Sequence, residues 1–167
     1  KSKIDKCFLV PDNIIHDLIK KLISNKKYFN KMIFDGYPRN LNQAKKLDLN
    51  IKEFNQKISC VLNINIEQDI VLKRILGRRT CSKCGLTFNK YFNPANSNNH
   101  QCGDKYMKIR SDDNQDIVVK RFDIYNKQTL PIINYYRDQD LLHDVNGRVA
   151  IPSINKEISG IIKRLET

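Results

Sequence analysis

The sequence lacks the features that mark several large classes of protein. It has no tryptophan and only six glycines, and no glycine belongs to the pattern Gly-x-x-x-x-Gly-Lys-Ser/Thr, whose backbone amides cradle phosphate groups. No apolar run approaches the roughly 18 residues of a membrane-spanning helix. No segment resembles a secretory leader, and the sequence starts with lysine instead of methionine. A membrane-spanning helix and a phosphate-binding loop are therefore not expected within these 167 residues.

The cysteine pattern does not suit a disulfide framework. The five cysteines are odd in number and come without a secretory leader. Cys60 lies in an apolar run and is interpreted as an unreactive core residue, and Cys7 has no evident partner. The other three fall within the short segment 81–102, which suggests a shared role.

Positive charge dominates the chain. Thirty lysines and arginines oppose 18 aspartates and glutamates, which gives a formal net charge of +12. Such an excess attracts anions such as nucleotides, nucleic acids or acidic membranes. Lysine is common here alongside asparagine and isoleucine, so most lysines are interpreted as solvated surface residues. The arginines are fewer and more clustered, and they are more informative.

Apolar periodicity predicts helices and strands in alternation. The pattern after Pro11 predicts a helix with Asp12 as its N-cap. Expected helices cover residues 12–22, 40–47, 67–76, 114–136 and 153–165, and expected strands cover residues 32–35, 58–64 and 141–145. Such alternation is typical of an α/β fold in which helices flank a parallel sheet.

One segment differs in character from the rest of the chain. It carries Gly, Asn, Pro and Cys with little apolar periodicity, which indicates a small inserted unit. The sequence therefore predicts a core part over residues 1–77, an insert over residues 78–110, and a second core part over residues 111–167.

The most specific motif is the peptide Asp-Gly-Tyr-Pro-Arg at residues 35–39, followed by Gln43. A strand is expected to end here, glycine permits close approach of a ligand to the backbone, and proline fixes the exit direction. Arg39 then projects from the carboxyl end of a strand, where α/β sheets bind ligands, and its planar fork suits a phosphate. Gln43 lies one helical turn further on and can pair with a base edge.

This motif resembles the AMP-site signature of the adenylate kinase family. Further similar segments extend the resemblance over nearly the whole chain: Leu-Val-Pro-Asp at residues 9–12, a lid entry at residues 74–79, a lid exit at residues 110–113, and a following helix at residues 120–122. The resemblance implies a P-loop-kinase-like parallel sheet with an inserted lid. It also implies a monomeric enzyme that transfers a phosphoryl group reversibly from ATP to AMP with Mg²⁺, giving two ADP.

The resemblance also implies roles for individual residues. The AMP-site positions are Leu9, Val10, Gly36, Arg39 and Gln43, with Arg39 for the phosphate and Gln43 for adenine. The arginines that close around the transferred group are Arg74, Arg78, Arg110 and Arg121. Asp112 and Asp113 match acidic residues that pair with lid arginines or with magnesium-bound water. The backbone near Val149 is expected to contact the ATP base.

Electrostatics supports the roles of the arginines. Phosphoryl transfer needs several fixed cations, because charge spreads over the phosphates in the transition state. Arg74 and Arg78 are four residues apart, and Arg110 and Arg121 flank the far end of the insert. Paired arginines at both hinges fit a lid that closes over phosphates and excludes water.

The cysteines of the insert suggest a zinc site. Cys81 and Cys84 form a Cys-x-x-Cys-Gly knuckle that places two thiolates on one zinc ion, and Cys102 is a third candidate ligand. Zinc-bearing lids of the family complete the site with Cys-x-x-Cys or Cys-x-x-Asp. Asp104 comes one residue early for that pattern but is favoured as the fourth ligand, with His100 as its rival. One alternative is a decayed site in which packing alone holds the lid; a redox pair is disfavoured, because glycine follows it instead of a helix.

The missing phosphate-binding loop qualifies these expectations. In the family that loop and the first strand lie near the N-terminus, so we interpret the 167 residues as part of a longer enzyme. We expect no phosphoryl transfer from these residues alone. We also expect a gap between residues 32–35 and 58–64, where the first strand would lie.

Three alternatives remain open. One is a kinase that uses GTP or another donor with AMP, because donor bases are often read by backbone groups. Another is a kinase-like protein without activity. The third, from another class, is a basic zinc-ribbon module that binds nucleic acid, which explains the charge and the cysteines but not residues 35–43. The favoured ligands are thus ATP, AMP and ADP, with no membrane partner, in an intracellular protein that is cytoplasmic or, as a second possibility, mitochondrial.

Overall fold

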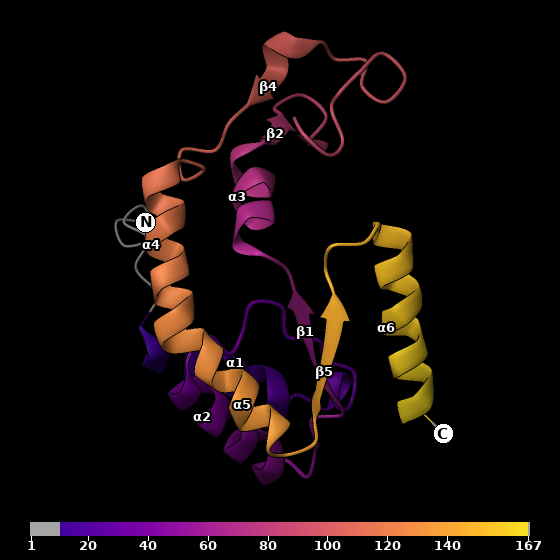
Figure 1. The fold of residues 1–167 in the computed structure, drawn as a ribbon. Coiled ribbons are helices and arrows are strands. Elements are labelled where there is room, and N and C mark those ends of the chain that lie inside the picture. The colour runs from indigo at the N-terminus through magenta and orange to yellow at the C-terminus, as the bar shows by residue number, and fades with distance from the viewer. Residues whose placement is uncertain (1–10, 167) are drawn as a thin grey trace.

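The computed structural model describes residues 11–166, and Figure 1 shows helices around a short parallel sheet, with a lid projecting from this body. The body contains helices α1 (Asp12–Ser24), α2 (Leu41–Glu53), α3 (Gln68–Leu76), α4 (Gln115–Ile124), α5 (Leu130–Arg137) and α6 (Ile151–Leu165), a 3₁₀ turn (Lys26–Tyr28), and strands β1 (Val61–Asn65) and β5 (Leu142–Asn146). Helices α3 and α4 are the arms that join the lid to the body. The predicted α/β architecture with an insert is therefore confirmed.

The parallel sheet joins segments that are far apart in the sequence. Strands β1 and β5 pair in register from Val61 opposite Leu142 to Asn65 opposite Asn146. The chain between them forms α3, the lid, α4 and α5, so this connection is a crossover that contains the whole lid. Both strands end on the side of the lid (Figure 1), which is where parallel sheets bind ligands.

The prediction of a buried strand at residues 32–35 is wrong for this structure. Within residues 11–166, β5 is the one strand that pairs with β1, and no ladder includes the 32–35 segment. Without a neighbouring strand its backbone makes no ladder, and Ile33 is 94% exposed. Met32 and Phe34, which alternate with Ile33, pack against the helical core. The segment and β1 do not pair directly, in agreement with the predicted gap.

Two apolar clusters hold the helices together. One cluster joins α1 to α2 and the other joins α2 to α5. Their buried members are Ile23, Leu47 and Ile51 in the first, and Ala44, Ile132 and Tyr136 in the second. Leu47 and Ile51 are one helical turn apart, so they share the buried face of α2. Full burial of such a side chain is worth about 1.5–3 kcal/mol.

A buried polar contact fixes α5 on α2. The Asp48 carboxylate accepts hydrogen bonds from the hydroxyls of Tyr135 at 2.6 Å and Tyr136 at 3.1 Å. Burial and the neighbouring Asp48 charge raise the pKa of Tyr136, so its hydroxyl stays protonated and donates. These two hydrogen bonds hold helix α2, which follows the predicted AMP-site motif, against two successive residues of α5.

The predicted helix over residues 114–136 is confirmed, with one irregularity. Asn114 caps it, because its side chain accepts from the Ile117 backbone N–H. A π-helical turn over Tyr125–Thr129 separates α4 from α5, and the Leu130 N–H bonds to the Tyr125 carbonyl. Pro131 follows directly and has no N–H to offer a helical carbonyl, which accounts for a wider turn here.

The lid is a small antiparallel sheet. Its strands are β2 (Arg78–Cys81), β3 (Thr87–Asn89) and β4 (Met107–Lys108), in the order β3-β2-β4, and a 3₁₀ turn covers Asp104–Tyr106. The strands are short, and the loops between them carry most of the residues. Among residues 11–166, no helix is long and apolar enough to cross a membrane.

Candidate active site and lid metal centre

The turn of the predicted AMP-site motif depends on glycine. Gly36 has φ +67°, a left-handed conformation that glycine adopts without strain. A Cβ atom added there would lie 3.1 Å from Arg39 Nη2. The Arg39 Nε donates to the Gly36 carbonyl at 2.6 Å. The glycine therefore leaves room for the arginine side chain to fold back over the turn.

Arg39 is exposed and its terminal nitrogens are available. Among residues 11–166, the Gly36 carbonyl is the one hydrogen-bond partner of the Arg39 guanidinium. Its backbone N–H donates to Gln43 Oε1 at 2.7 Å, and its carbonyl accepts from Thr129 Oγ1 at 2.8 Å. The backbone is thus fixed from two sides while the Nη atoms can receive an anion.

Gln43 is placed differently from what the sequence suggested. Its side chain is 1% exposed, and both ends of its amide are engaged, by the Arg39 N–H and by Asp12. The expected contact with adenine stays a prediction, because the amide is covered in this structure. The prediction that Asp12 caps α1 is wrong: Pro11 occupies the N-cap position, and the Asp12 carboxylate binds Asn40 and Gln43 instead.

The other predicted base contacts are Leu9, Val10 and Val149. Leu9 and Val10 lie outside the described residues. Val149 follows the turn after β5 and is 38% exposed. That turn is fixed against β1, because the Gly147 N–H donates to the Asn65 carbonyl at 2.8 Å.

Carboxylates hold three of the four predicted transfer arginines. Arg78 forms a bidentate ion pair with Asp113, whose side chain is fully buried. Asp112 accepts from Arg121 at 2.6 Å and from Arg110 at 3.1 Å. Hydrogen bonding from Arg121, then from Arg110, lowers the pKa of Asp112, and the bond to Asp113 raises that of Arg78. Both lid hinges thus contain charges that are fixed in place.

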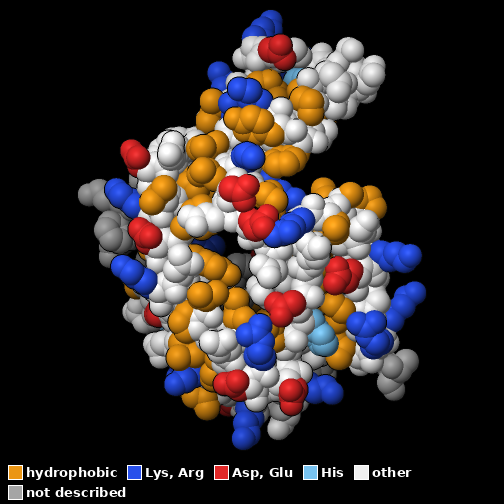
Figure 2. Space-filling view, viewed as in Figure 1, with side chains coloured by type: hydrophobic (Ala, Val, Ile, Leu, Met, Phe, Trp, Pro, Cys, Tyr) orange, Lys and Arg blue, Asp and Glu red, His pale blue; other side chains and the backbone are white. Residues whose placement is uncertain are grey.

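Arg74 reaches the turn after β5 by a different route. Its Nη2 donates to the Gly147 carbonyl at 3.0 Å, and its guanidinium lies 5.7 Å from the centre of the Phe92 ring. Sequence reasoning missed the part that Phe92 and Gly147 play, because these contacts span 18 and 73 positions and follow no local pattern. Figure 2 shows charged side chains of both signs where the lid meets the body, above a hollow between α4 and β1.

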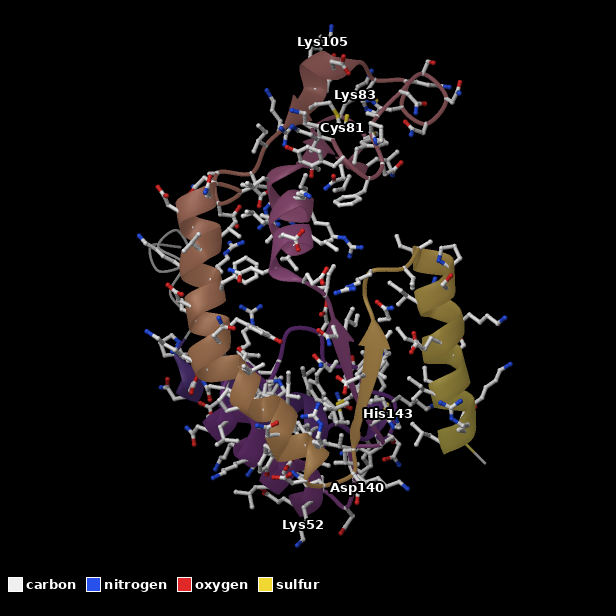
Figure 3. All side chains as sticks on the ribbon, in the orientation of Figure 1. Lys52, Cys81, Lys83, Lys105, Asp140 and His143 are labelled. Atoms are coloured by element: carbon white, nitrogen blue, oxygen red, sulfur yellow. The ribbon has the colours of Figure 1, made fainter. Side chains whose placement is uncertain are left out.

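Four metal-ligating side chains converge in the lid. The ligand atoms of Cys81, Cys84, His100 and Cys102 all lie within 4.8 Å of one another. Asp104 is not in this group and begins the 3₁₀ turn. The preference for Asp104 is therefore corrected in favour of His100, which the loop after β3 folds back over the knuckle. Figure 3 places Cys81 inside the lid, with Lys83 and Lys105 farther from the body.

The chemistry of the cluster suits a metal ion. His100 is 8% exposed and packs on Phe88, yet its Nε2 atom is buried without a hydrogen-bond partner. Burial opposes ionisation of Cys81, but the backbone N–H groups of Cys84 and Lys83 and the His100 side chain outweigh it, and the pKa falls to about 6. A thiolate and an unpartnered imidazole nitrogen are ligands that zinc accepts.

Cys60 fits its interpretation as an unreactive residue. It is half-buried at the start of the parallel sheet, and burial raises the pKa of its thiol. A raised pKa keeps the thiol protonated and poorly nucleophilic at neutral pH.

Comparison with known proteins agrees with this geometry. The adenylate kinase family model matches residues 1–141. An adenylate kinase of Pelagibacter ubique is 40% identical over 92% of the chain, one of Archaeoglobus fulgidus 36% over 100%, and one of Enterococcus faecalis 35% over 97%. The chain covers 72%, 77% and 76% of these relatives, respectively. On this similarity and on the motifs that the fold brings together, the chain belongs to the adenylate kinase family.

Proposed function

We propose that this chain supplies the AMP site, the lid and the transfer arginines of an enzyme that moves a phosphoryl group reversibly between ATP and AMP. The observation that carries the proposal is the placement of Arg74, Arg78, Arg110 and Arg121 at the two hinges of the lid, each with an oriented guanidinium. Charge stabilisation and positioning supply most of the catalysis in phosphoryl transfer. Four arginines at the mouth of a lid match that need.

The partners of these arginines fit an open lid. Each guanidinium is held by a carboxylate or a carbonyl, so it is oriented before a nucleotide arrives. Phosphate oxygens can take the place of these acceptors when the lid closes, because they accept the same bidentate hydrogen bonds. Closure would then exclude water from the reacting groups.

The acceptor site is assigned to the turn at residues 36–39. Arg39 presents free Nη atoms on a backbone that Gln43 and Thr129 hold from opposite sides. A guanidinium binds a terminal phosphate through two parallel hydrogen bonds. We assign it to the phosphate of AMP, and we keep Gln43 as the adenine contact on the family resemblance alone.

Two metals enter the proposal in different roles. The lid cluster of Cys81, Cys84, His100 and Cys102 would hold Zn²⁺ as a structural ion, since four protein ligands leave no open position. Mg²⁺ would accompany ATP and neutralise charge on its phosphates. Asp112 and Asp113 are engaged with arginines here, so we assign them first to the hinges and only secondarily to magnesium-bound water.

The remaining alternatives concern the donor nucleotide and the class of protein. Donor choice between ATP and GTP stays a proposal in favour of ATP, because backbone groups near Val149 would read the donor base. A nucleic-acid-binding module is disfavoured, because family membership accounts for residues 35–43, which that alternative does not explain. A monomeric state and a cytoplasmic location stay predictions.

Arg39 provides the test of the proposed acceptor site. Arg39→Ala should weaken AMP binding to this chain about 10- to 150-fold in calorimetric titration, because a hydrogen bond to a charged group is worth about 1.5–3 kcal/mol. Arg137→Ala is the matched control, since it removes an exposed arginine paired with Asp144. Unchanged AMP affinity in Arg39→Ala would overturn the acceptor site.

A further inference from the structure

A closed set of hydrogen bonds joins the start of α1 to the AMP-site turn. Asp12 Oδ1 accepts from Gln43 Nε2 at 2.6 Å, and Asp12 Oδ2 accepts from Asn40 Nδ2 at 3.1 Å. Gln43 Oε1 accepts from the Arg39 backbone N–H at 2.7 Å. Asn40 Oδ1 accepts from the Gln43 backbone N–H at 2.8 Å and so caps α2.

The chemistry of Asp12 sets the direction of every bond in this set. An ionised carboxylate accepts hydrogen bonds and donates none, so both amide side chains must turn their NH₂ groups toward it. The oxygen of Gln43 then faces the Arg39 N–H, and the oxygen of Asn40 faces the first turn of α2. If the Gln43 amide were reversed, oxygen would face carboxylate and NH₂ would face N–H, which would lose both bonds.

Burial makes this arrangement rigid. Gln43 is 1% exposed, so water cannot replace a partner that its amide loses. Hydrogen bonds in such surroundings are electrostatically stronger than in water, and an unpaired buried amide is costly. The orientation of the Gln43 amide therefore persists as long as Asp12 remains an acceptor for both of its neighbours.

We propose that Asp12 is a positioning residue for AMP: through Gln43 it fixes the Arg39 backbone, and with it the guanidinium that receives the AMP phosphate. The Arg39 side chain folds back to the Gly36 carbonyl at 2.6 Å, so its direction depends on where its own backbone lies. Because Gln43 is covered and both ends of its amide are engaged, Asp12 acts on the phosphate end of AMP. This inference rests on the proposed acceptor site.

The test replaces the carboxylate by a group of the same size. Asp12→Asn places a single acceptor oxygen and an NH₂ group opposite two donors, so one of the two amides loses its partner. AMP affinity of the 167-residue chain should fall about 3- to 10-fold in calorimetric titration, as expected for one lost hydrogen bond. Asp17→Asn on the exposed side of α1 is the matched control and should leave AMP affinity unchanged.

Two further measurements separate positioning from a general effect on the fold. Ribose 5-phosphate carries the phosphate without adenine, so its affinity should fall with Asp12→Asn by the same factor as that of AMP. In the Arg39→Ala background, Asp12→Asn should have no further effect on AMP, because coupled residues are not additive. If Asp12→Asn fails to fold, Asp12→Glu keeps the charge but displaces it by one methylene and should give the same pattern.

The outcomes distinguish this inference from the function on which it rests. An unmodified chain that does not bind AMP overturns both. If AMP binds normally and Asp12→Asn leaves the affinity for ribose 5-phosphate unchanged, the inference fails and the acceptor site stands. A loss that AMP and ribose 5-phosphate share, and that disappears without Arg39, supports the positioning role.

Discussion

The lid and the helical body are held together by different interactions. In the body, apolar side chains from α1, α2 and α5 form two buried clusters. In the lid, the buried residues are Cys81, Phe88 and His100, and two of these are candidate metal ligands. A unit as small as residues 78–110 usually needs a disulfide, a metal ion or a partner to be stable alone, since domains below about 40 residues bury too little surface. The comparison teaches that the body relies on packing, whereas the lid has little apolar packing and instead brings four candidate metal ligands together.

The largest expected effect comes from removing the lid ligands. Cys81→Ser/Cys84→Ser should abolish binding of about one zinc per chain in elemental analysis. The amides of β2 and β3 should then lose hydrogen-exchange protection, because binding at structural zinc sites is worth about 10–16 kcal/mol and is coupled to folding. The body should keep its protection, since neither apolar cluster contains a lid residue.

Cys60→Ser provides the matched control for the metal experiment. It removes a thiol from the body and should leave zinc content and lid protection unchanged. If the double variant keeps its lid protection without metal, packing alone holds the lid and the contrast between the two regions disappears.

A pair of isoleucines tests packing in the body. Ile23→Ala should lower the free energy of unfolding by about 2–5 kcal/mol, because Ile23 is fully buried in the first cluster. Ile33→Ala should change it by less than about 0.5 kcal/mol, since that side chain is 94% exposed. Denaturant titration of both variants gives the comparison. A large loss in Ile33→Ala would mean that a partner covers residues 32–35 in solution.

The next largest effect is expected at the hinge between the lid and the body. Asp113→Asn removes a buried charge from the bidentate pair with Arg78, which is 30% exposed. We expect local destabilisation of about 1–3 kcal/mol, less than for a fully buried pair. If Asp113→Asn speeds hydrogen exchange more at β2 than in α2, relative to the unmodified chain, the effect lies at the hinge. Asp138→Asn, a change on a loop away from the lid, should leave both rates unaltered.

Acid should produce the smallest effect. Arg121 and Arg110 lower the pKa of Asp112 in the folded chain, so this contact stabilises above the usual carboxyl pKa of about 3.9. That contribution is lost as pH falls through the lowered folded pKa. The melting temperature of Asp112→Asn should be lower than that of wild type at pH 7, and this difference should shrink toward pH 3. It should be small, because Asp112 is partly exposed.

Local pattern was enough to place most of the elements. The helices α1, α3 and α6 and the strands β1 and β5 start and end within a few residues of their predicted bounds, whereas α2 continues beyond its predicted end at residue 47 to Glu53. Periodicity and capping residues such as Asn114 set these bounds locally. The motif at residues 35–39 was equally readable, because its turn needs glycine at position 36 for reasons of backbone geometry.

Local pattern did not predict the features that depend on contacts with other segments of the chain. Residues 32–35 have the composition of a strand, yet a strand exists only with a partner, and none of the described segments provides one. Asp12 has the position of an N-cap, but the amides of Asn40 and Gln43 compete for its carboxylate.

The sequence by itself determined the family signature, the order of helices and strands, the arginines at the lid and three of the four cluster ligands, because these depend on residue type and spacing. Only the tertiary structure decided that His100 replaces Asp104, since loop closure after β3 sets which ligand atom comes within 4.8 Å. It also decided that Asp12 joins Gln43 and that Arg74 meets Gly147 and Phe92. Those contacts join positions that are far apart in the sequence, so they stabilise the chain only after the helices have packed.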